Sequence, residues 1–332
     1  MLAAATDAKP QTLPVSLKND TVKMGKTIIL LLTLFISITS YGQRTETVFL
    51  NASDKTSNMY VAIFPKNEII KSFMVLLDGF GNTPNSALSQ TGIPKFATKN
   101  GILTIMPVLK TGSSYWGSDR TSQESLKEII NFVASKYQLK DKDFYIGGFG
   151  IGGTCAVKYS ELAVQENYEI KPKSIFAINP ILDWERYYNG AKRVIRLSDT
   201  SKVNDEVFYM INRIEKEMGG TPETALQNYH SQSPYSFSDT TQKAIKNLIK
   251  IPIMIISEPD IQWYLNERNY DCSYNNITDQ VAMINELQRL GNKNAVLITT
   301  TNKGYRMPNK VRHPNSWSIA DPKQIIKWLQ TL

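Results

Sequence analysis

The stretch Tyr145-Ile-Gly-Gly-Phe-Gly-Ile-Gly-Gly-Thr154 places five glycines directly after a short apolar run. An apolar strand followed by glycines predicts a sharp turn into a helix, because glycine permits backbone angles and close packing that other residues do not. From Gly148 to Gly153 the stretch has the G-x-G-x-x-G spacing of a dinucleotide-binding loop. From Gly148 to Gly152 it also has the spacing of G-x-S-x-G, with Gly150 in the central position.

The residues that follow the glycines decide between these two motifs. A dinucleotide-binding loop is followed, about 20 residues further on, by an acid at the end of the next strand, which holds a ribose. Here the next apolar run, Ser174–Ile178, ends in Asn179-Pro180, and the first acid after it is Asp183. The sequence therefore argues against a nicotinamide-dependent enzyme, and we expect no cofactor.

The second motif predicts two further residues in a fixed chain order. G-x-S-x-G marks a nucleophile elbow, and an acid after a later strand and a histidine after the last strand complete its site. Asp260 follows the apolar run Ile251–Ile256, and His313 follows the run Ala295–Thr299. The nucleophile position, the acid and the histidine thus stand in the expected order.

The same alternation of apolar runs and helical patterns extends over the chain from residue 45. Two strands with alternating faces come first, at Thr45–Leu50 and Met59–Phe64, and continuous apolar runs follow, which are typical of parallel strands buried on both faces. These runs are 73–77, 101–106, 144–146, 174–178, 251–256 and 295–299. The pattern predicts an α/β fold with a doubly wound, mostly parallel sheet and antiparallel N-terminal edge strands.

Helix ends are also visible in the sequence. Thr121-Ser-Gln-Glu124 has the spacing of a capping box, Gly291 follows a helical pattern over Asp279–Leu290, and Asp321-Pro322 opens a final amphipathic pattern. The segment from about 184 to 250 shows helical patterns at 204–218 and 240–248 but no core strand. We predict that it is a helical lid inserted into the main domain, which spans 43–332.

The first 42 residues have the character of a targeting segment. Basic residues in Lys23–Lys26 precede the apolar run Thr27–Thr39, and the small residues Ser40 and Gly42 follow it. This arrangement predicts a signal peptide with an upstream extension, cleavage near Gln43, and a secreted or periplasmic protein without a stable membrane anchor. An uncleaved anchor is the alternative, although the run is shorter than the roughly 18 residues of a membrane span. Either Met1 or Met24 can serve as the start.

Composition excludes several classes of protein. Of the 332 residues, 42% are hydrophobic and 20% charged, which is typical of a globular domain with a full core. The net charge of +8 comes from scattered lysines and arginines, so we expect no nucleic-acid partner. The two histidines and two cysteines are too widely spread for a metal site. A Cys155–Cys272 disulfide is allowed in an exported protein but not required.

On these residues the chain from 43 to 332 resembles a secreted α/β-hydrolase of the esterase type. The resemblance implies an oxyanion loop after the third strand, at Leu77-Asp-Gly-Phe-Gly81. The backbone N–H groups of Phe80 and Ile151 would then face the substrate carbonyl, Asp260 would orient His313, and His313 would act as the base. The sequence departs from the family at one position, because Gly150 stands where the family has serine.

This departure changes the expected function. Gly150 cannot form an acyl-enzyme, and loss of the nucleophile from such a triad lowers the rate by about 10⁶. We therefore predict a pseudoenzyme or ligand-binding module. The alternative is an esterase-like hydrolase of a carboxylic ester that uses an activated water, with His313 as base, or another nucleophile. The sequence does not place any other hydroxyl or thiol residue against His313 for this role. The residues considered are Thr154 and Cys155, about one turn into the helix after Gly150, and the loop residues Ser257, Ser273 and Ser316.

Several side chains are candidates for the ligand pocket. Five aromatic residues follow strands and either line a pocket for an aryl group or a sugar, or pack the lid: Tyr115, Trp116, Trp263, Tyr264 and Trp317. Arg268 and Asp271 are three residues apart, so they form either a surface pair or a substrate-orienting pair. His230 precedes the acid, and we expect it to be a surface or lid residue. The oligomeric state is not indicated.

Overall fold

The computed structural model describes residues 43–51, 53–198 and 203–332. The predicted signal peptide lies outside these residues. None of the helices in the three described ranges combines the length and the apolar character that a membrane span requires.

One eight-stranded sheet runs through the described domain, in the order β1-β2-β4-β3-β5-β6-β7-β8. The pairs β1–β2 and β2–β4 are antiparallel and all other neighbours are parallel. This confirms the predicted mostly parallel sheet with an antiparallel N-terminal edge. The strands are β1 (Thr45–Phe49), β2 (Met59–Ile63), β3 (Ser72–Leu77), β4 (Ile102–Val108), β5 (Asp143–Phe149), β6 (Ser174–Ile178), β7 (Ile253–Ser257) and β8 (Ala295–Thr299).

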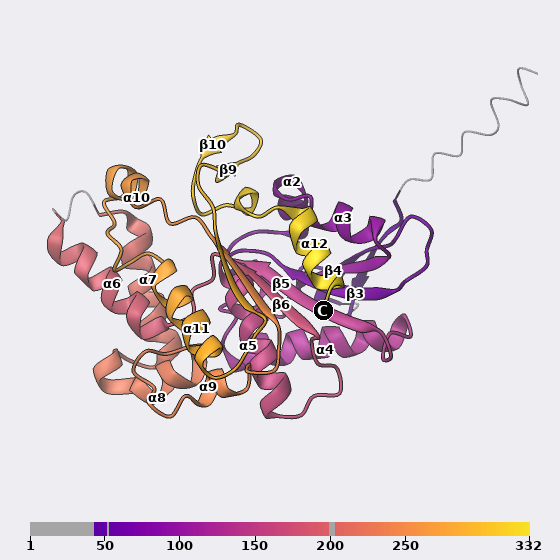
Figure 1. Cartoon of the computed structure of the whole chain (residues 1–332), viewed down its shortest axis with the longest axis horizontal. Coiled ribbons are helices and arrows are strands. Elements are labelled where there is room, and N and C mark those ends of the chain that lie inside the picture. The colour runs from indigo at the N-terminus through magenta and orange to yellow at the C-terminus, as the bar shows by residue number, and fades with distance from the viewer. Residues whose placement is uncertain (1–42, 52, 199–202) are drawn as a thin grey trace, which may run out of the picture. The chain divides into compact units, whose positions relative to one another are not determined.

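Helices cover both faces of this sheet (Figure 1). On one face α4 (Arg120–Lys136), α5 (Ile151–Gln165) and α11 (Ile277–Arg289) pack on side chains such as Phe73 and Val75. On the other face α3 (Ile93–Lys99) and α12 (Pro322–Gln330) pack on their neighbours, Met74 and Leu76. Because successive strand residues point to opposite faces, a strand buried on both faces must be apolar throughout.

The predicted helix ends are partly confirmed. Helix α12 begins with Pro322, and the Asp321 side chain accepts a hydrogen bond from the backbone N–H of Lys323, as Asp-Pro predicts. The predicted capping box at Thr121 is wrong, since α4 already begins at Arg120. Its N-cap is Asp119, two residues before the predicted cap Thr121. The Asp119 carboxylate accepts a hydrogen bond from the backbone N–H of Ser122 and so satisfies a free donor of the first turn.

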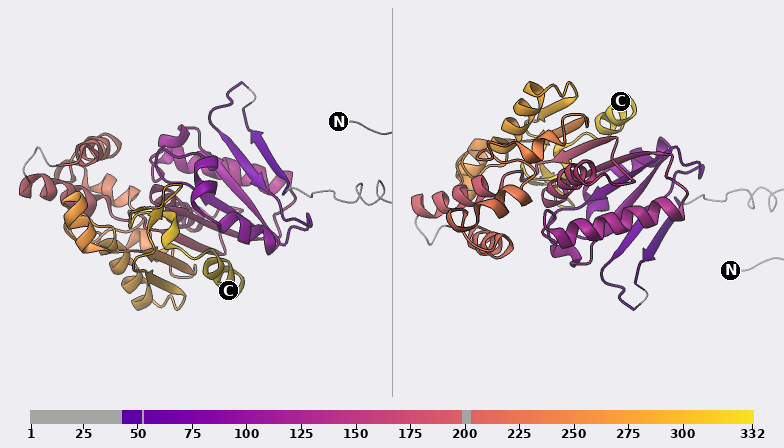
Figure 2. Two further views of the ribbon diagram at one scale, coloured as in Figure 1. Left: turned by 90° about the horizontal axis from the view of Figure 1, so that it is seen from above. Right: turned by 90° about the horizontal axis from the view of Figure 1, so that it is seen from below.

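The inserted segment between β6 and β7 is helical, and its described part contains no strand. Its helices are α6 (Trp184–Leu197), α7 (Asp205–Met218), α8 (Pro222–Gln232) and the short α9 (Lys243–Lys246). Helices α6 and α8 were not predicted, although α6 buries an apolar stripe at helical spacing. Helices α6, α7 and α8 lie together at the end of the domain away from β1 and β2 (Figures 1 and 2).

Shorter elements complete the domain at the loops that follow the strands. Helix α10 and the hairpin of β9 and β10 project on the same side of the sheet in Figure 1. These shorter elements are α2 (Pro84–Gln90), the 3₁₀ turns Gly112–Ser114 and Trp317–Ile319, α10 (Ile261–Arg268), β9 (Tyr305–Arg306) and β10 (Val311–Arg312).

Candidate functional site

The turn from β5 into α5 has the tight geometry that its glycines require. A Cβ atom at Gly148 would lie 2.5 Å from the carbonyl carbon of Gly152, and one at Gly152 would lie 2.5 Å from the carbonyl oxygen of Leu77. Gly150 between them has the backbone angles φ 54 and ψ −122, a conformation that residues other than glycine rarely adopt. A Cβ at Gly150 would meet nothing within 4 Å. The turn is therefore shaped like an elbow with room for a side chain at its tip.

A pocket of about 490 Å³ lies over Gly150. The expected residues Phe80, Ile151, Trp116 and Trp317 line it. The inserted helices contribute part of its wall, through Tyr187 of α6 and Tyr209 and Met210 of α7. The wall is mainly aromatic and apolar around the glycine, which suits the nonpolar body of a small ligand.

The loop after β3 is held rigidly beside this pocket. The N–H of Gly81 donates to the carbonyl oxygen of Ser113 at 2.9 Å, and Asp78 Oδ1 accepts from the Gly79 N–H at 2.7 Å and from Trp317 Nε1 at 3.1 Å. In the described part of the chain the backbone N–H groups of Phe80 and Ile151 donate no hydrogen bond. Two backbone donors are thus available at the pocket, and their action on a substrate oxygen stays a prediction.

Asp78 is a buried carboxyl group in this loop. Burial raises its pKa, and the hydrogen bonds from the Gly79 N–H and from Trp317 act in the opposite direction. The Tyr115 hydroxyl donates to the backbone oxygen of Asp78, and Tyr115 is buried. Tyr115 therefore supports the loop from behind and does not line the pocket.

His313 lies beside this pocket but outside its lining. Its ring is nearly buried and lines an adjoining cavity of about 210 Å³. The backbone N–H of Asn315 points at Nδ1 at 3.2 Å, and Nη2 of Arg268 lies 3.2 Å from Nε2. A neutral imidazole accepts at one nitrogen only, so one of these contacts is a hydrogen bond. In either tautomer the ring faces hydrogen-bond donors, whereas the histidine of a triad donates to a carboxylate.

The expected pairing of Asp260 with His313 is absent from the described residues. Asp260 caps α10, where its Oδ1 accepts from the N–H of Trp263 at 3.1 Å, and its Oδ2 accepts from Nη2 of Arg312 at 2.6 Å. Arg312 also pairs with the buried Glu258 at 2.7 Å. The structure differs from the expectation because a guanidinium makes stronger charge-assisted hydrogen bonds to carboxylates than a neutral imidazole does.

The surroundings of His313 keep its ring neutral. Burial, followed by the charges of Arg306 and Arg268, lowers its pKa to about 3, and the hydrogen bond from the Asn315 N–H acts in the opposite direction. A general base works best when its pKa lies near the working pH. His313 in this arrangement is a poor base at neutral pH.

The two cavities adjoin each other. Both are lined by Tyr187, Glu206, Asn276, Arg306 and Asn315. Tyr264 lines the smaller cavity, while Trp263 lines neither and packs on the His313 ring with 4.8 Å between ring centroids. Of the five aromatic candidates, three thus line one of the two adjoining cavities. Arg306, Glu206 and Asn315 could not be predicted as site residues from the sequence, because no motif or spacing connects them.

The alternative nucleophiles are engaged elsewhere. Thr154 Oγ1 donates to the carbonyl oxygen of Ile181 at 2.7 Å, and Cys155 is buried, which raises the pKa of its thiol well above the usual value. Ser257 donates to Asn179 at 3.1 Å, and Ser273 bonds to Asp271. Only Ser316 lines the Gly150 pocket, where its hydroxyl lies 3.1 Å from that of Ser318. Cys155 and Cys272 are free thiols.

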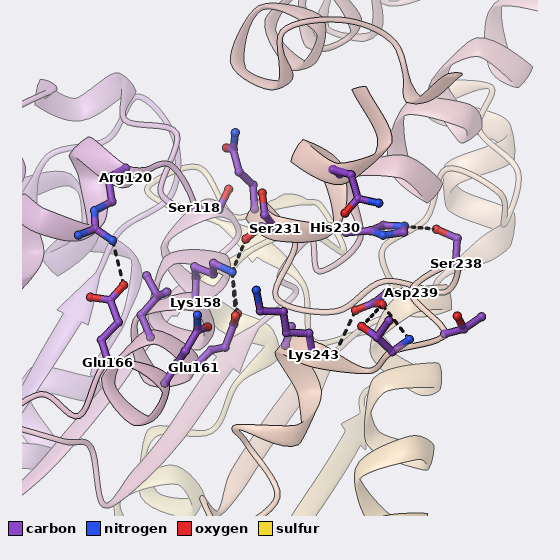
Figure 3. Close-up of a pocket in the computed structure, with 17 residues that line it drawn as sticks. Ser118, Arg120, Lys158, Glu161, Glu166, His230, Ser231, Ser238, Asp239 and Lys243 are labelled. Carbon is purple, nitrogen blue, oxygen red and sulfur yellow. Dashed lines mark hydrogen bonds and ion pairs between the residues drawn. The ribbon is translucent and has the colours of Figure 1, made fainter. Parts of the chain in front are cut away.

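A separate pocket of about 480 Å³ lies between α5, α8 and α9 (Figure 3). Most of its charged side chains satisfy one another: Lys158 Nζ lies 2.8 Å from Glu161, and Arg120 lies 2.9 Å from Glu166. His230 Nε2 lies 2.7 Å from Ser238 Oγ. His230 lines this pocket and not the pocket over Gly150. In the three described ranges no group of three or more His, Cys, Asp and Glu is arranged to hold a metal.

Comparison with known proteins identifies the fold. No family model matches the sequence, and no curated protein is significantly similar. Among solved structures, Pyrobaculum calidifontis esterase is 15% identical with a TM-score of 0.55, and the match covers 93% of each chain. An esterase structure from Rhizomucor miehei is 13% identical with a TM-score of 0.55, covering 96% of this chain and 91% of that one.

A peptidase has the same architecture. Pyrococcus horikoshii acylaminoacyl peptidase is 14% identical with a TM-score of 0.56, and the match covers 90% of this chain. The chain spans 43% of the peptidase, which is therefore a much longer protein. Together with the strand order, these likenesses show that the chain has the α/β-hydrolase fold.

Proposed function

We propose that this protein is an exported pseudoenzyme of the α/β-hydrolase fold, which binds a small-molecule ligand in the pocket over Gly150. The observation that carries the proposal is the combination of a glycine at the elbow with a histidine that faces an arginine and a backbone amide. The elbow position thus carries no nucleophilic side chain, and His313 is not aligned to activate one. A pocket that remains open and aromatic-walled suits a ligand with an aryl, acyl or sugar body.

The proposal is tested by hydrolysis of short acyl and aryl esters and by labelling with a fluorophosphonate, which reacts with activated serines. We expect the wild-type chain to hydrolyse esters no faster than its His313→Ala variant and to remain unlabelled. Binding of non-hydrolysable aryl and sugar ligands is measured in parallel by calorimetry. Efficient wild-type hydrolysis would contradict the proposal.

An esterase that activates a water is the second candidate. The open space at Gly150 and the two backbone donors of Phe80 and Ile151 favour it, because a water can occupy the volume of a missing serine side chain. It requires His313 to turn toward Gly150 and to bind a proton near neutral pH. A measurable wild-type rate that falls at least tenfold in His313→Ala would support this candidate over the first.

Export is tested separately. We expect expression in a bacterial host with a secretion pathway to give a chain whose N-terminus lies near Gln43. An intact N-terminus in the membrane fraction would indicate the uncleaved anchor instead.

A further inference from the structure

Two arginines and one acid, Glu206, line the cavity beside the Gly150 pocket. Arg268 from the last turn of α10 and Arg306 from β9 both line it, and neither forms an ion pair with any residue that the structure describes. Arg306 is solvent-exposed by surface area, and desolvation followed by the charge of Arg268 lowers its pKa, while the charge of Glu206 acts in the opposite direction. Two like charges in one cavity destabilise the empty protein.

The neighbouring charges are engaged differently. Arg312 is neutralised by Glu258 and Asp260, at 2.7 and 2.6 Å. Asp271, which could have paired with Arg268, instead pairs with Arg193 at 3.0 Å. In the pocket of Figure 3, Lys158 and Arg120 have carboxylate partners. Arg268 and Arg306 have no such carboxylate partner among the described residues, and their contacts are with His313 at 3.2 Å and with the Asn315 carbonyl oxygen at 3.4 Å.

Buried polar atoms without partners line the same cavity. The Tyr270 hydroxyl and the Asn275 Nδ2 amide belong to residues only 8% exposed, and neither atom forms a hydrogen bond within the described ranges. Asn275 Oδ1 accepts from the N–H of Ile277 at 3.0 Å, which leaves Nδ2 as a donor. The Tyr274 hydroxyl lies beside that of Tyr187 without a hydrogen bond of good geometry. Buried donors without acceptors are rare in folded proteins, and a bound ligand is one reason for them.

These donors are held in place by packing. The rings of Tyr187 and Tyr274 lie 4.5 Å apart, and those of Tyr270 and Tyr274 lie 4.8 Å apart. The loop that carries Tyr274 also approaches α6 closely, because a Cβ at Gly190 would lie 2.3 Å from the carbonyl oxygen of Ser273. Donors fixed in this way lose little freedom when a ligand arrives.

Charge balance favours a singly charged ligand group. Among the residues that the structure describes, Glu206 is the only acid lining the cavity, and its charge opposes those of Arg268 and Arg306. His313, the remaining titratable residue apart from the tyrosines, is neutral because burial and the arginines lower its pKa to about 3. One positive charge is left for the ligand to neutralise. A carboxylate carries one negative charge and has the planar shape that guanidinium groups bind.

We propose that this cavity binds the carboxylate of a ligand between Arg268 and Arg306, with Tyr270 and Asn275 as further donors. The rest of the ligand extends into the pocket over Gly150, with which the cavity shares five lining residues. This inference rests on the proposed ligand-binding function and names the chemical class of the ligand. The ligand is a carboxylic acid with an aryl, acyl or sugar body.

Calorimetry on the full chain tests the inference with matched pairs of probes. Benzoate is compared with benzamide, glucuronate with glucose, and inorganic phosphate is added as a different anion. We expect at least one carboxylate to bind about 10-fold more tightly than its neutral partner, and Arg268→Gln and Arg306→Gln each to weaken that binding by about 10-fold. Arg289→Gln, an exposed arginine at the end of α11, is the matched control and should leave binding unchanged.

Several results would overturn the inference. They are equal binding of a carboxylate and its neutral partner, tighter binding of phosphate than of any carboxylate, and no binding of any probe. Equal binding of a carboxylate and its neutral partner would show a ligand pocket without an anion subsite. This result would overturn the present inference and leave the proposed ligand-binding function intact. Hydrolysis of esters by the wild type would contradict the proposed function without affecting the calorimetry.

The stability of the empty protein gives a readout that does not depend on the probe. We expect Arg306→Gln to raise the melting temperature by about 2 °C, because it relieves the repulsion from Arg268. Arg312→Gln, which leaves Glu258 and Asp260 without a partner, should lower it. If Arg306→Gln lowers the melting temperature as much as Arg312→Gln does, Arg306 is a structural residue and the inference fails.

Discussion

Arg312 lies 2.6 Å from the carboxylate of Asp260 and forms an ion pair with it. The order of residues along the chain predicts that Asp260 would instead accept a hydrogen bond from His313. Arg312 and His313 are neighbours in sequence, yet only Arg312 contacts Asp260. The histidine ring turns instead toward Arg268 and the Asn315 amide. An arrangement of this kind predicts that restoring the nucleophile is not sufficient to restore catalysis.

We expect Gly150→Ser to hydrolyse 4-nitrophenyl acetate no more than about 10-fold faster than Gly150→Ala, whereas an aligned triad contributes about 10⁶. Serine at 150 has room, but no neighbouring base is oriented to take its proton. The alanine variant is the control, because it carries the same backbone strain without the hydroxyl. A serine variant 10³-fold faster than the alanine variant would show that His313 and Asp260 align in solution.

The glycines on either side of Gly150 have a structural role. We expect Gly148→Ala and Gly152→Ala each to lower the free energy of unfolding by about 3 kcal/mol or more, because the added Cβ would lie 2.5 Å from backbone atoms that cannot move aside. Denaturant unfolding measures the change. Gly112→Ala is the control: unlike Gly148 and Gly152 it has a positive φ, at 74, but its Cβ would meet nothing within 4 Å, so only the backbone cost of about 1 kcal/mol is expected. Equal losses at Gly112 and Gly148 would refute the packing argument.

His313 should make stability depend on pH. Its pKa is about 3 in the folded chain and near 6.5 in the unfolded chain, so between these values the unfolded chain binds the extra proton. Stability is therefore complete above about pH 6.5 and falls as the pH decreases toward 3, by up to about 1.4 kcal/mol per pH unit from this group. Denaturant unfolding from pH 7 to pH 4 measures the slope, and His313→Gln should flatten it. An unchanged slope in the variant would show that His313 titrates normally.

The buried pair Lys158–Glu161 offers a test of the interior electrostatics. Both side chains are 4% exposed, and Lys158 also donates to the carbonyl oxygen of Ser231 at 2.6 Å. We expect Lys158→Met alone to lower the free energy of unfolding by about 3–5 kcal/mol, because it leaves the Glu161 carboxylate buried without a partner. The double variant Lys158→Met/Glu161→Leu should recover most of this loss. Arg120→Gln, in an exposed pair, should change stability by less than about 1 kcal/mol. A double variant as unstable as the single one would contradict the interpretation.

The sheet could be predicted from the sequence because its signals are local. The run Ser174–Ile178 coincides with β6, which is buried along its whole length, as expected for a central strand covered on both faces. The run Ala295–Thr299 coincides with β8, although this edge strand is mostly half-buried. The glycines around 150 predicted the elbow for the same reason, as the turn leaves no room for other residues. Helix α6 was missed although its apolar stripe is present, and the capping residue of α4 was misplaced because Asp119 and Thr121 are both acceptable caps.

The sequence by itself determined the fold and the glycine-rich turn at residue 150, because both depend on residue type at short spacing. Only the tertiary structure decided which side chains meet. Arg268 ends helix α10, whereas Arg306 and Arg312 belong to the hairpin of β9 and β10. The pairing of Arg312 with Asp260 and the approach of Arg268 to His313 depend on distances that chain order does not encode. Electrostatic interactions fall off with separation in space, so the state of the histidine and the character of the cavity could be read only once the loops were placed together.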